Sequence, residues 1–246
     1  PDVTVTAGSI EDKSGNQISE TTVTASDGIS PQNPSGISFT QDSVNKDNQQ
    51  SIDIDVDFGS APEAGDVTLR VDDSDSDGDA LTFSKSASQT TTFSDKDLSS
   101  LDDGTLTATA KIVDDSSNTN SEGFTAPQTV QKDTTDPILK KAERETDTKF
   151  TFEVHDEGNG LDANTVQSQD FVLTNQDYSA SSFSVGTCND EDLTCSVTAT
   201  LSEPIDQDTL TVGFSSDSQI SDVEGNTQSS DTVQVSGMDG VAPTLD

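Results

Sequence analysis

The sequence lacks most of the side chains on which enzymes and nucleic-acid-binding proteins depend. Its 246 residues include no Trp, one Tyr, one His and only 11 Lys and Arg. Phosphate backbones are bound through Lys and Arg, so direct nucleic-acid binding is excluded. Few aromatic rings are available for stacking on sugars, which disfavours a glycosidase or a lectin. Serine- or cysteine-based catalysis would depend on His155 alone, and we expect no enzymatic activity.

Long apolar runs are also missing. Hydrophobic residues make up 28% of the chain, and no stretch approaches the roughly 18 apolar residues of a membrane-spanning helix. We therefore expect no membrane span. Low hydrophobicity combined with a high net charge is typical of disordered chains, but regular strand patterns, described below, favour a folded protein.

The charge is strongly one-sided, with 47 Asp and Glu and a formal net charge of −36. Asp dominates and Lys is scarce, a composition that resembles proteins of extreme halophiles. At low salt such a surface repels itself, whereas at molar salt the Debye length falls to about 3 Å and the repulsion is screened. We therefore expect a halophilic protein, with a polyacidic disordered tail as the alternative.

The chain contains an internal repeat. Pro31, Pro137 and Pro243 each lie 106 residues apart (137 − 31 and 243 − 137), and each closes a segment that begins with Asp four residues earlier. Similar turns precede these prolines, at 12–16, 114–118 and 222–226. A fixed period of this length indicates a tandem array of domains.

The repeat predicts the domain boundaries. Residues 32–137 and 138–243 are expected to be complete units, and residues 244–246 to begin the next one. Residues 1–31 are expected to be the last two strands of a preceding unit, which is either truncated in this sequence or completed by a neighbouring molecule through strand addition.

Apolar and polar residues alternate with a period of two in many short segments. In Ser51–Phe58, Ile52, Ile54, Val56 and Phe58 share one face and Asp occupies the other. Such strands, separated by Gly, Asn, Asp and Ser turns, predict antiparallel sheets that are apolar on one side only, and two such sheets bury these sides together. The predicted fold class is all-β, with tandem Ig-like antiparallel β-sandwiches of about 100 residues each.

Two longer segments carry a family resemblance. Residues 98–114, continuing to Asp133-Thr-Thr-Asp-Pro137, resemble the closing half of bacterial Ig-like domains, and residues 154–226 are similar to the sister type found in surface-layer and adhesin stalks. In this family Gly-Asn usually occupies the place of Asn118-Thr119, so we expect this turn to differ. The resemblance implies an extracellular tandem stalk, and it provides no catalytic residues.

The only two cysteines, Cys188 and Cys195, flank a short loop between two predicted strands. We expect a hairpin disulfide, which suits a chain outside the cytoplasm; two reduced thiols are the alternative. Two thiolates and one imidazole do not supply the four ligands of a structural zinc site.

One segment matches the start of a calcium-binding loop. Asp73, Asp75, Asp77 and Asp79 alternate around Gly78, but the twelfth position is Ser84 instead of the bidentate Glu of such loops. This segment is therefore either a Ca²⁺ site or a solvated acidic turn between two strands.

Aspartates also gather at the unit junctions. Asp133, Asp136 and Asp239 can hold a cation between domains, although the sequence lacks a full ligand set, and we interpret Asp12–Asn16 and Asp222–Asn226 as plain Asx turns. No other cofactor is expected.

The sequence as a whole predicts a structural protein at the cell surface. We expect part of a tandem stalk, surface layer or filament on a halophilic cell, with neighbouring copies of the same protein as partners. The alternative is a segment of an adhesin or viral spike that binds a host surface partner. An accessory domain of a secreted hydrolase is a third possibility.

Overall fold

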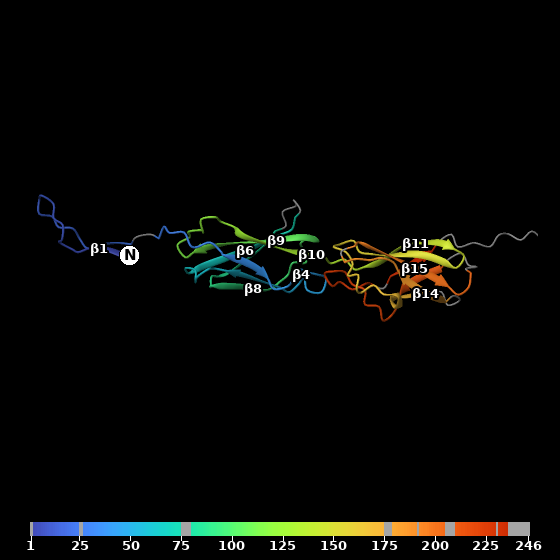
Figure 1. Cartoon of the computed structure of the whole chain (residues 1–246). Helices are drawn as coiled ribbons and strands as arrows, with labels where there is room; N and C mark the ends of the chain where they lie inside the picture. The colour runs from blue at the N-terminus through green and yellow to red at the C-terminus, as the bar shows by residue number, and fades with distance from the viewer. Residues whose placement is uncertain are drawn as a thin grey trace, which may run out of the picture.

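The computed structural model describes residues 2–24, 27–74, 80–174, 179–190, 192–204, 210–229 and 231–235. Within these ranges the chain forms seventeen β-strands and one short 3₁₀ helix, Ser168–Asp170. The predicted all-β fold class is confirmed. Figure 1 shows a hairpin at the N-terminus followed by two β-sandwiches arranged end to end. No helix among the described residues has the length and apolar character needed to cross a membrane.

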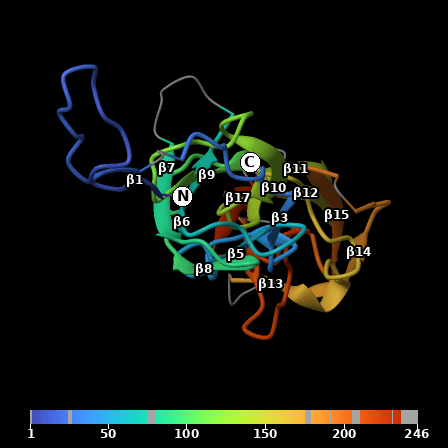
Figure 2. The same cartoon turned by 90° about the vertical axis from the view of Figure 1, so that its left-hand side faces the viewer.

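The N-terminal hairpin consists of β1 (Asp2–Val5) and β2 (Thr21–Thr24), paired antiparallel with Val3 opposite Val23. Both valines are 62% exposed. In the end-on view of Figure 2 the hairpin lies to one side of the sandwiches. The described part of the chain therefore provides no sheet that covers the apolar side of this hairpin.

The first sandwich has two sheets with the strand orders β4-β10-β9-β6-β7 and β3-β5-β8. In chain order its strands correspond to A, A′, B, C, C′, E, F and G of an immunoglobulin-like sandwich, with A′ parallel to G. These strands are β3 (Gly36–Phe39), β4 (Ser43–Val44), β5 (Ile52–Asp57), β6 (Gly65–Asp72), β7 (Leu81–Ser86), β8 (Thr90–Lys96), β9 (Gly104–Asp114) and β10 (Thr125–Lys132).

The period-two patterns explain how this sandwich forms its core. Along β5, Ile52, Ile54 and Val56 are fully buried, while the aspartates between them are only half-buried. Strands β6 and β9 alternate in the same way. The buried apolar residues from 37 to 130 form one cluster between the two sheets.

The second sandwich has the strand orders β11-β12-β15-β14 and β13-β16-β17. Lettered in chain order, these are A-B-E-D and C-F-G, the constant-type immunoglobulin topology. The strands are β11 (Ile138–Thr146), β12 (Lys149–His155), β13 (Phe171–Leu173), β14 (Ala180–Val185), β15 (Thr194–Leu201), β16 (Leu210–Phe214) and β17 (Thr232–Val235). Its separate core spans residues 139 to 235, and the Phe152 and Phe171 rings meet edge to face at 5.1 Å inside it.

The three turns of the repeat share one conformation. In each, the first Asp accepts hydrogen bonds from the backbone and the side chain of the Asn four residues later. Gly15 and Gly225 precede that Asn with φ of 85° and 89°, and Ser117 takes the same place with φ of 72°. The expected departure at Asn118-Thr119 is therefore wrong, because Asn118 is the Asn of the turn and Ser117 accepts the left-handed conformation that glycine usually provides.

The predicted unit boundaries, 1–31, 32–137, 138–243 and 244–246, stay a prediction. The two core clusters are separated by the segment 133–137, but residues 236–246 lie outside the described ranges.

Candidate metal centre

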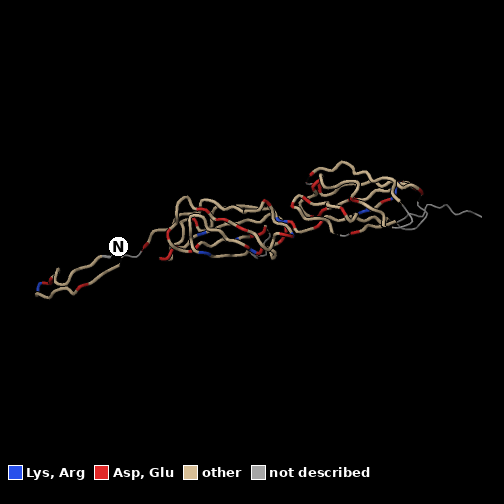
Figure 3. The backbone as a smooth tube through the Cα atoms, turned by 90° about the horizontal axis from the view of Figure 1, so that it is seen from below, with Lys and Arg blue, Asp and Glu red and all other residues tan. Residues whose placement is uncertain are grey.

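Three aspartates converge where the two sandwiches meet. Asp133 belongs to the segment that links β10 to β11, Asp156 follows β12, and Asp222 opens the turn between β16 and β17. One carboxylate oxygen of each lies within 4.8 Å of the other two. The three side chains are 1%, 0% and 2% exposed, respectively. Figure 3 shows acidic residues along the described part of the chain and on both sides of this junction.

Local hydrogen bonds hold Asp133 and Asp156 in place. Asp133 Oδ1 accepts hydrogen bonds from the backbone N of Thr135 at 2.9 Å and from its Oγ1 at 2.7 Å. Asp156 Oδ2 accepts from the backbone N of Gly158 at 3.0 Å and of Gly160 at 2.8 Å. A Cβ on Gly158 would lie 1.7 Å from Asp133 Oδ2. Glycine therefore leaves the space that the linker carboxylate occupies, and any side chain here would displace it.

Asp222 is fixed by the repeat turn and joined to the linker through Asn226. Its Oδ1 accepts from the Asn226 backbone N at 2.9 Å and its Oδ2 from Asn226 Nδ2 at 2.7 Å. Asn226 Nδ2 also donates to the Asp133 carbonyl at 2.8 Å. The turn of the second sandwich is thus bonded directly to the segment that leaves the first.

A loop of the first sandwich contacts the same turn. After β4, Asn45 Nδ2 donates to the Glu224 carbonyl at 2.7 Å, and the Lys46 backbone N donates to Asn226 Oδ1 at 2.8 Å. Lys46 Nζ also pairs with Asp136 at 2.6 Å. Figure 1 shows β4 and β10 at the end of the first sandwich that faces the second. These bonds fix the turn between the linker and the first sandwich.

The buried carboxylates at this junction lie close together and repel one another when they are charged. Burial raises the pKa of Asp222 to about 6, and the carboxylates of Asp133 and Asp156 add to the effect. Burial likewise raises the pKa of Asp156 and of Glu224. Glu224 Oε1 accepts from Asn159 Nδ2 at 3.0 Å, whereas its buried Oε2 has no hydrogen-bond partner. Buried carboxylates favour the neutral form unless a cation balances them.

The donor set suits a hard cation. All candidate ligand atoms are oxygens, which Ca²⁺ and Mg²⁺ prefer, whereas zinc prefers sulfur and nitrogen. Two oxygens bound to one Ca²⁺ at about 2.4 Å are at most about 4.8 Å apart, and the three carboxylates meet this limit. The residues present therefore fit a cation.

The preceding junction repeats this arrangement in a more open form. Asp27, Glu63 and Asp114 also bring three carboxylate oxygens within 4.8 Å of one another. They come from the linker, the loop between the B and C strands (β5 and β6) and the repeat turn, and the buried cluster is built from the equivalent three segments. Asn118 Nδ2 donates to the Asp27 carbonyl at 3.4 Å, and Asn226 Nδ2 makes the equivalent bond to the Asp133 carbonyl at the next junction. Asp27 and Glu63 are exposed, so this cluster carries a smaller burial penalty.

The predicted calcium loop is only partly visible. Asp73 accepts a hydrogen bond from the Asp102 backbone N at 3.0 Å, while Asp75, Asp77 and Asp79 lie outside the described residues. The loop therefore stays a prediction.

Of the junction aspartates singled out from the sequence, only Asp133 lies in the cluster. Asp136 pairs with Lys46 instead, and Asp239 is outside the described ranges. Asp156 was missed, and Asp222 was interpreted only as a turn residue. The repeated Asp-x-x-x-Asn spacing was the available signal for Asp222.

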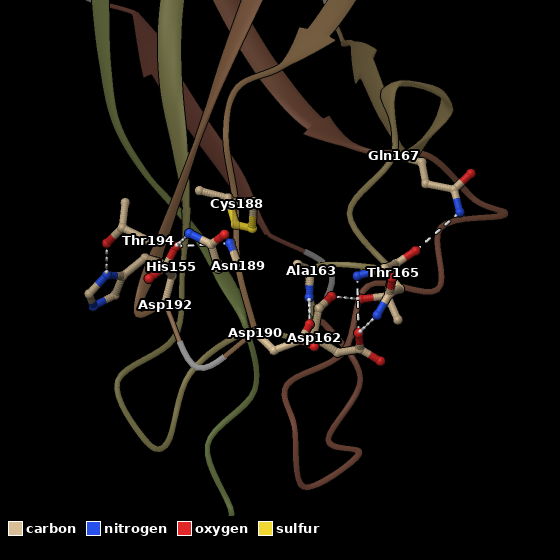
Figure 4. Close-up of a disulfide and its surroundings, with 12 residues drawn as sticks. His155, Asp162, Ala163, Thr165, Gln167, Cys188, Asn189, Asp190, Asp192 and Thr194 are labelled. Carbon is tan, nitrogen blue, oxygen red and sulfur yellow. Dashed lines mark hydrogen bonds between the residues drawn. A yellow bond between two sulfur atoms is a disulfide. The ribbon is translucent and has the colours of Figure 1, made fainter.

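Cys188 and Cys195 form a disulfide with Cα atoms 5.2 Å apart. Figure 4 shows it beside the loop between β14 and β15, where Asn189 Nδ2 donates to Asp192 at 3.0 Å. His155 Nδ1 lies 3.0 Å from Thr194 Oγ1 on the neighbouring strand. The imidazole therefore contributes to strand pairing.

Comparisons with known proteins show likeness in structure but not in sequence. No protein-family model matches the chain, and no curated protein matches it either. Among solved structures, a tetra-tandem repeat in the extending region of a large adhesion protein is 17% identical with a TM-score of 0.39, covering 97% of this chain and 55% of that one.

Two other solved structures are similar at the same level. A structure of a 1.5-MDa bacterial ice-binding adhesin is 17% identical with a TM-score of 0.37, covering 96% and 72% of the two chains. Invasin, described as a bacterial integrin-binding protein, is 15% identical with a TM-score of 0.30, covering 85% and 39%. The chain thus spans about half the length of the first of these structures.

Proposed function

We propose that the chain is a spacer segment of an extracellular cell-surface protein, in which tandem Ig-like sandwiches form an extended stalk. Its complete units are residues 32–137 and 138–243, residues 1–31 are the closing hairpin of a preceding unit, and residues 244–246 open the next. The observation that carries this proposal is the junction, where hydrogen bonds from Asn45, Lys46 and Asn226 hold consecutive sandwiches end to end.

A fixed junction makes the stalk stiff. A free linker of five residues would let two domains rotate against each other, since contacts between domains are usually sparse. Here Asn45 and Lys46, in the loop after β4, donate hydrogen bonds to the turn after β16. Asn226 of that turn donates to the Asp133 carbonyl of the linker. Pro137 adds to this, because proline fixes its own φ and keeps Asp136 extended.

We propose Ca²⁺ as the ion that completes the junction. Asp133, Asp156 and Asp222 would hold it. The ion would balance the buried negative charge and cross-link the linker to the second sandwich. Asp27, Glu63 and Asp114 would form the equivalent site at the preceding junction, so that the cation recurs with the repeat.

The role we favour is the extending region of an adhesin, which carries a binding domain away from the cell surface. A lattice or filament of neighbouring copies is the second candidate, favoured by the exposed apolar side of the N-terminal hairpin. The net charge of −36 supports a high-salt environment for either role. A cooperative fold that is unchanged after dialysis into dilute buffer would contradict the halophilic part of the proposal.

Small-angle scattering tests the stalk and its ion together. We expect the two-sandwich chain to keep one extended shape in Ca²⁺ and to sample bent shapes in chelator, in both cases at a fixed high KCl concentration. The double variant Asp133→Asn/Asp156→Asn should behave in Ca²⁺ as the wild type does in chelator. Asp217→Asn, an exposed carboxylate of the same sandwich, is the matched control. A wild type that bends equally with and without Ca²⁺ would contradict the proposed ion.

A further inference from the structure

The disulfide of the second sandwich lies next to the segment that provides Asp156. Cys188 belongs to the loop after β14, and Cys195 lies in β15. Cys195 is fully buried and lies opposite Val154 of β12, two residues before Asp156. The disulfide therefore closes a ring of the chain close to the end of the β12–β15 ladder, where the segment of the candidate metal centre begins.

The chain inside this ring bonds the backbone of the segment that follows β12. The Asp156 backbone N donates to the Leu193 carbonyl at 2.9 Å, and the Leu161 backbone N donates to the Asp192 carbonyl at 3.0 Å. Both acceptors lie between the two cysteines in the sequence. The position of the Asp156 backbone thus depends on the conformation that the disulfide imposes on this loop.

A compact turn within the ring makes a third contact. The Asn189 backbone N and its Nδ2 both donate to Asp192 Oδ2, at 2.9 and 3.0 Å. Asp190 Oδ1 accepts a hydrogen bond from the Ala163 backbone N at 3.0 Å. Figure 4 shows both contacts beside the disulfide. The ring is therefore bonded to the segment 156–163 near its start and at its end.

The same segment is bonded to the repeat turn. Leu161 forms a β-bridge with Asp222, and the Val223 backbone N donates to the Gly160 carbonyl at 3.0 Å. The segment that carries Asp156 is thus bonded both to the ring and to the turn that carries Asp222. A ring that loosens would disturb the relative position of the two carboxylates.

We propose that the Cys188–Cys195 disulfide positions Asp156 for the cation, so that the Ca²⁺ affinity of this junction depends on the oxidation state of the two cysteines. The ion itself rests on the proposed function, whereas the positioning of Asp156 does not. Removal of groups that hold a metal ligand in place typically weakens metal binding by about 10- to 100-fold. A ring of fixed conformation also lets the ion bind without first ordering the loop.

The reaction that opens the ring is disulfide exchange with a dithiol. A thiolate of the dithiol attacks one sulfur of the disulfide, and the other cysteine leaves as a thiolate that takes up a proton. The second thiol of the reagent then displaces the first cysteine, so that two protein thiols form and the dithiol becomes a disulfide. The chain has no other cysteines, so the cluster of Asp27, Glu63 and Asp114 should not respond.

Calorimetric Ca²⁺ titration of the full chain at a fixed high KCl concentration tests this dependence. The affinity of the buried site should fall about 10- to 100-fold in dithiothreitol and in Cys188→Ser/Cys195→Ser, and should return when the wild type is reoxidised. Asp133→Asn/Asp156→Asn lacks this site and identifies its contribution, and reductant should not change the binding that remains. A buried site that binds equally well in both oxidation states would overturn the proposal.

Two further variants separate positioning from a general loss of stability. Leu210→Ala truncates a fully buried side chain at the start of β16 and should lower urea stability without changing the Ca²⁺ affinity. Asp190→Ala removes the bond to Ala163 with the disulfide intact and should weaken Ca²⁺ binding, whereas Asp217→Ala, at an exposed carboxylate of the same sandwich, should not. If Leu210→Ala weakened binding as much as reduction does, affinity would follow stability and the proposal would be wrong.

Amide hydrogen exchange separates this inference from the proposed ion. In chelator, the Asp156 and Leu161 amides should exchange about tenfold faster or more after reduction, because their acceptors lie in the ring. The Phe58 amide, which donates to the Gln89 carbonyl in the first sandwich, is the control and should not respond. Unchanged exchange at Asp156 and Leu161 would overturn the proposal whatever the ion does. Faster exchange in a chain that binds no Ca²⁺ in either oxidation state would count against the ion alone.

Discussion

Replacing Asp222 by Asn should have opposite effects with and without Ca²⁺. In chelator at pH 7 the buried Asp222 carboxylate destabilises the second sandwich, because it lies beside two other carboxylates. Asn removes this charge while keeping nearly the same shape. In Ca²⁺ the same substitution removes a proposed ligand. We therefore expect the variant to be more stable than the wild type in chelator and to gain nothing from Ca²⁺.

The expected size follows from the pKa and the hydrogen bonds of Asp222. A rise of the pKa from 3.8 to about 6 corresponds to about 3 kcal/mol at neutral pH. Asn cannot accept the bond from Asn226 Nδ2 through its own amide nitrogen, and the loss of one such bond costs about 1 kcal/mol. The net gain in chelator is therefore about 2 kcal/mol. At Ca²⁺ concentrations 100-fold above Kd, the wild type should gain about 2.7 kcal/mol.

Urea unfolding at fixed KCl concentration is the suitable assay, since guanidinium chloride would itself screen the charges. The single tyrosine, Tyr178, belongs to the second unit, so its fluorescence distinguishes this unit from the first. Asp217→Asn is the matched control, because Asp217 is exposed and lies in the same unit. Similar midpoints for Asp222→Asn and Asp217→Asn in both buffers would refute the reasoning about the buried charge.

Three further predictions concern pH, glycine and the disulfide. The raised pKa of Asp222 lets the folded state retain a proton between about pH 4 and 6. In chelator this should make the wild type about 1 kcal/mol more stable at pH 5 than at pH 7. Urea midpoints that rise with pH in the wild type relative to Asp222→Asn would contradict this. Gly158→Ala should weaken Ca²⁺ binding by at least tenfold in calorimetry, because its Cβ would displace Asp133, whereas Gly59→Ala, with open space around it, should bind as the wild type does. Replacing both Cys188 and Cys195 by Ser should cost the second sandwich about 2–3 kcal/mol in urea, and an unchanged midpoint would show that the disulfide does not restrict the unfolded chain.

The fold could be predicted because its signals are local. The alternation of Ile52, Ile54 and Val56 with aspartate defines a strand with one apolar face, whatever lies opposite. The repeated Asp-x-x-x-Asn turn is likewise a local structure, in which one side chain bonds the backbone of its own segment. The turn that begins at Asp114 was wrongly expected to differ, because the sequence does not show that Ser117 adopts the left-handed conformation.

The candidate site could not be predicted to the same extent, because it is assembled from distant segments. Asp133, Asp156 and Asp222 are separated by tens of residues, and the chain contains 47 acidic residues that look alike in sequence. What distinguishes these three is that they are buried and also converge on one another, which depends on how one sandwich docks against the next. Asp136, only three residues from Asp133, faces Lys46 instead.

The sequence by itself determined the all-β fold and the repeat with its turns, because these depend on side-chain spacing within single strands and loops. It also determined the acidic coat, which follows from composition alone. Only the tertiary structure decided which carboxylates lose their contact with water and which strands pair with each other. Burial and strand pairing depend on contacts between segments far apart in the chain, and no local pattern of residues encodes them.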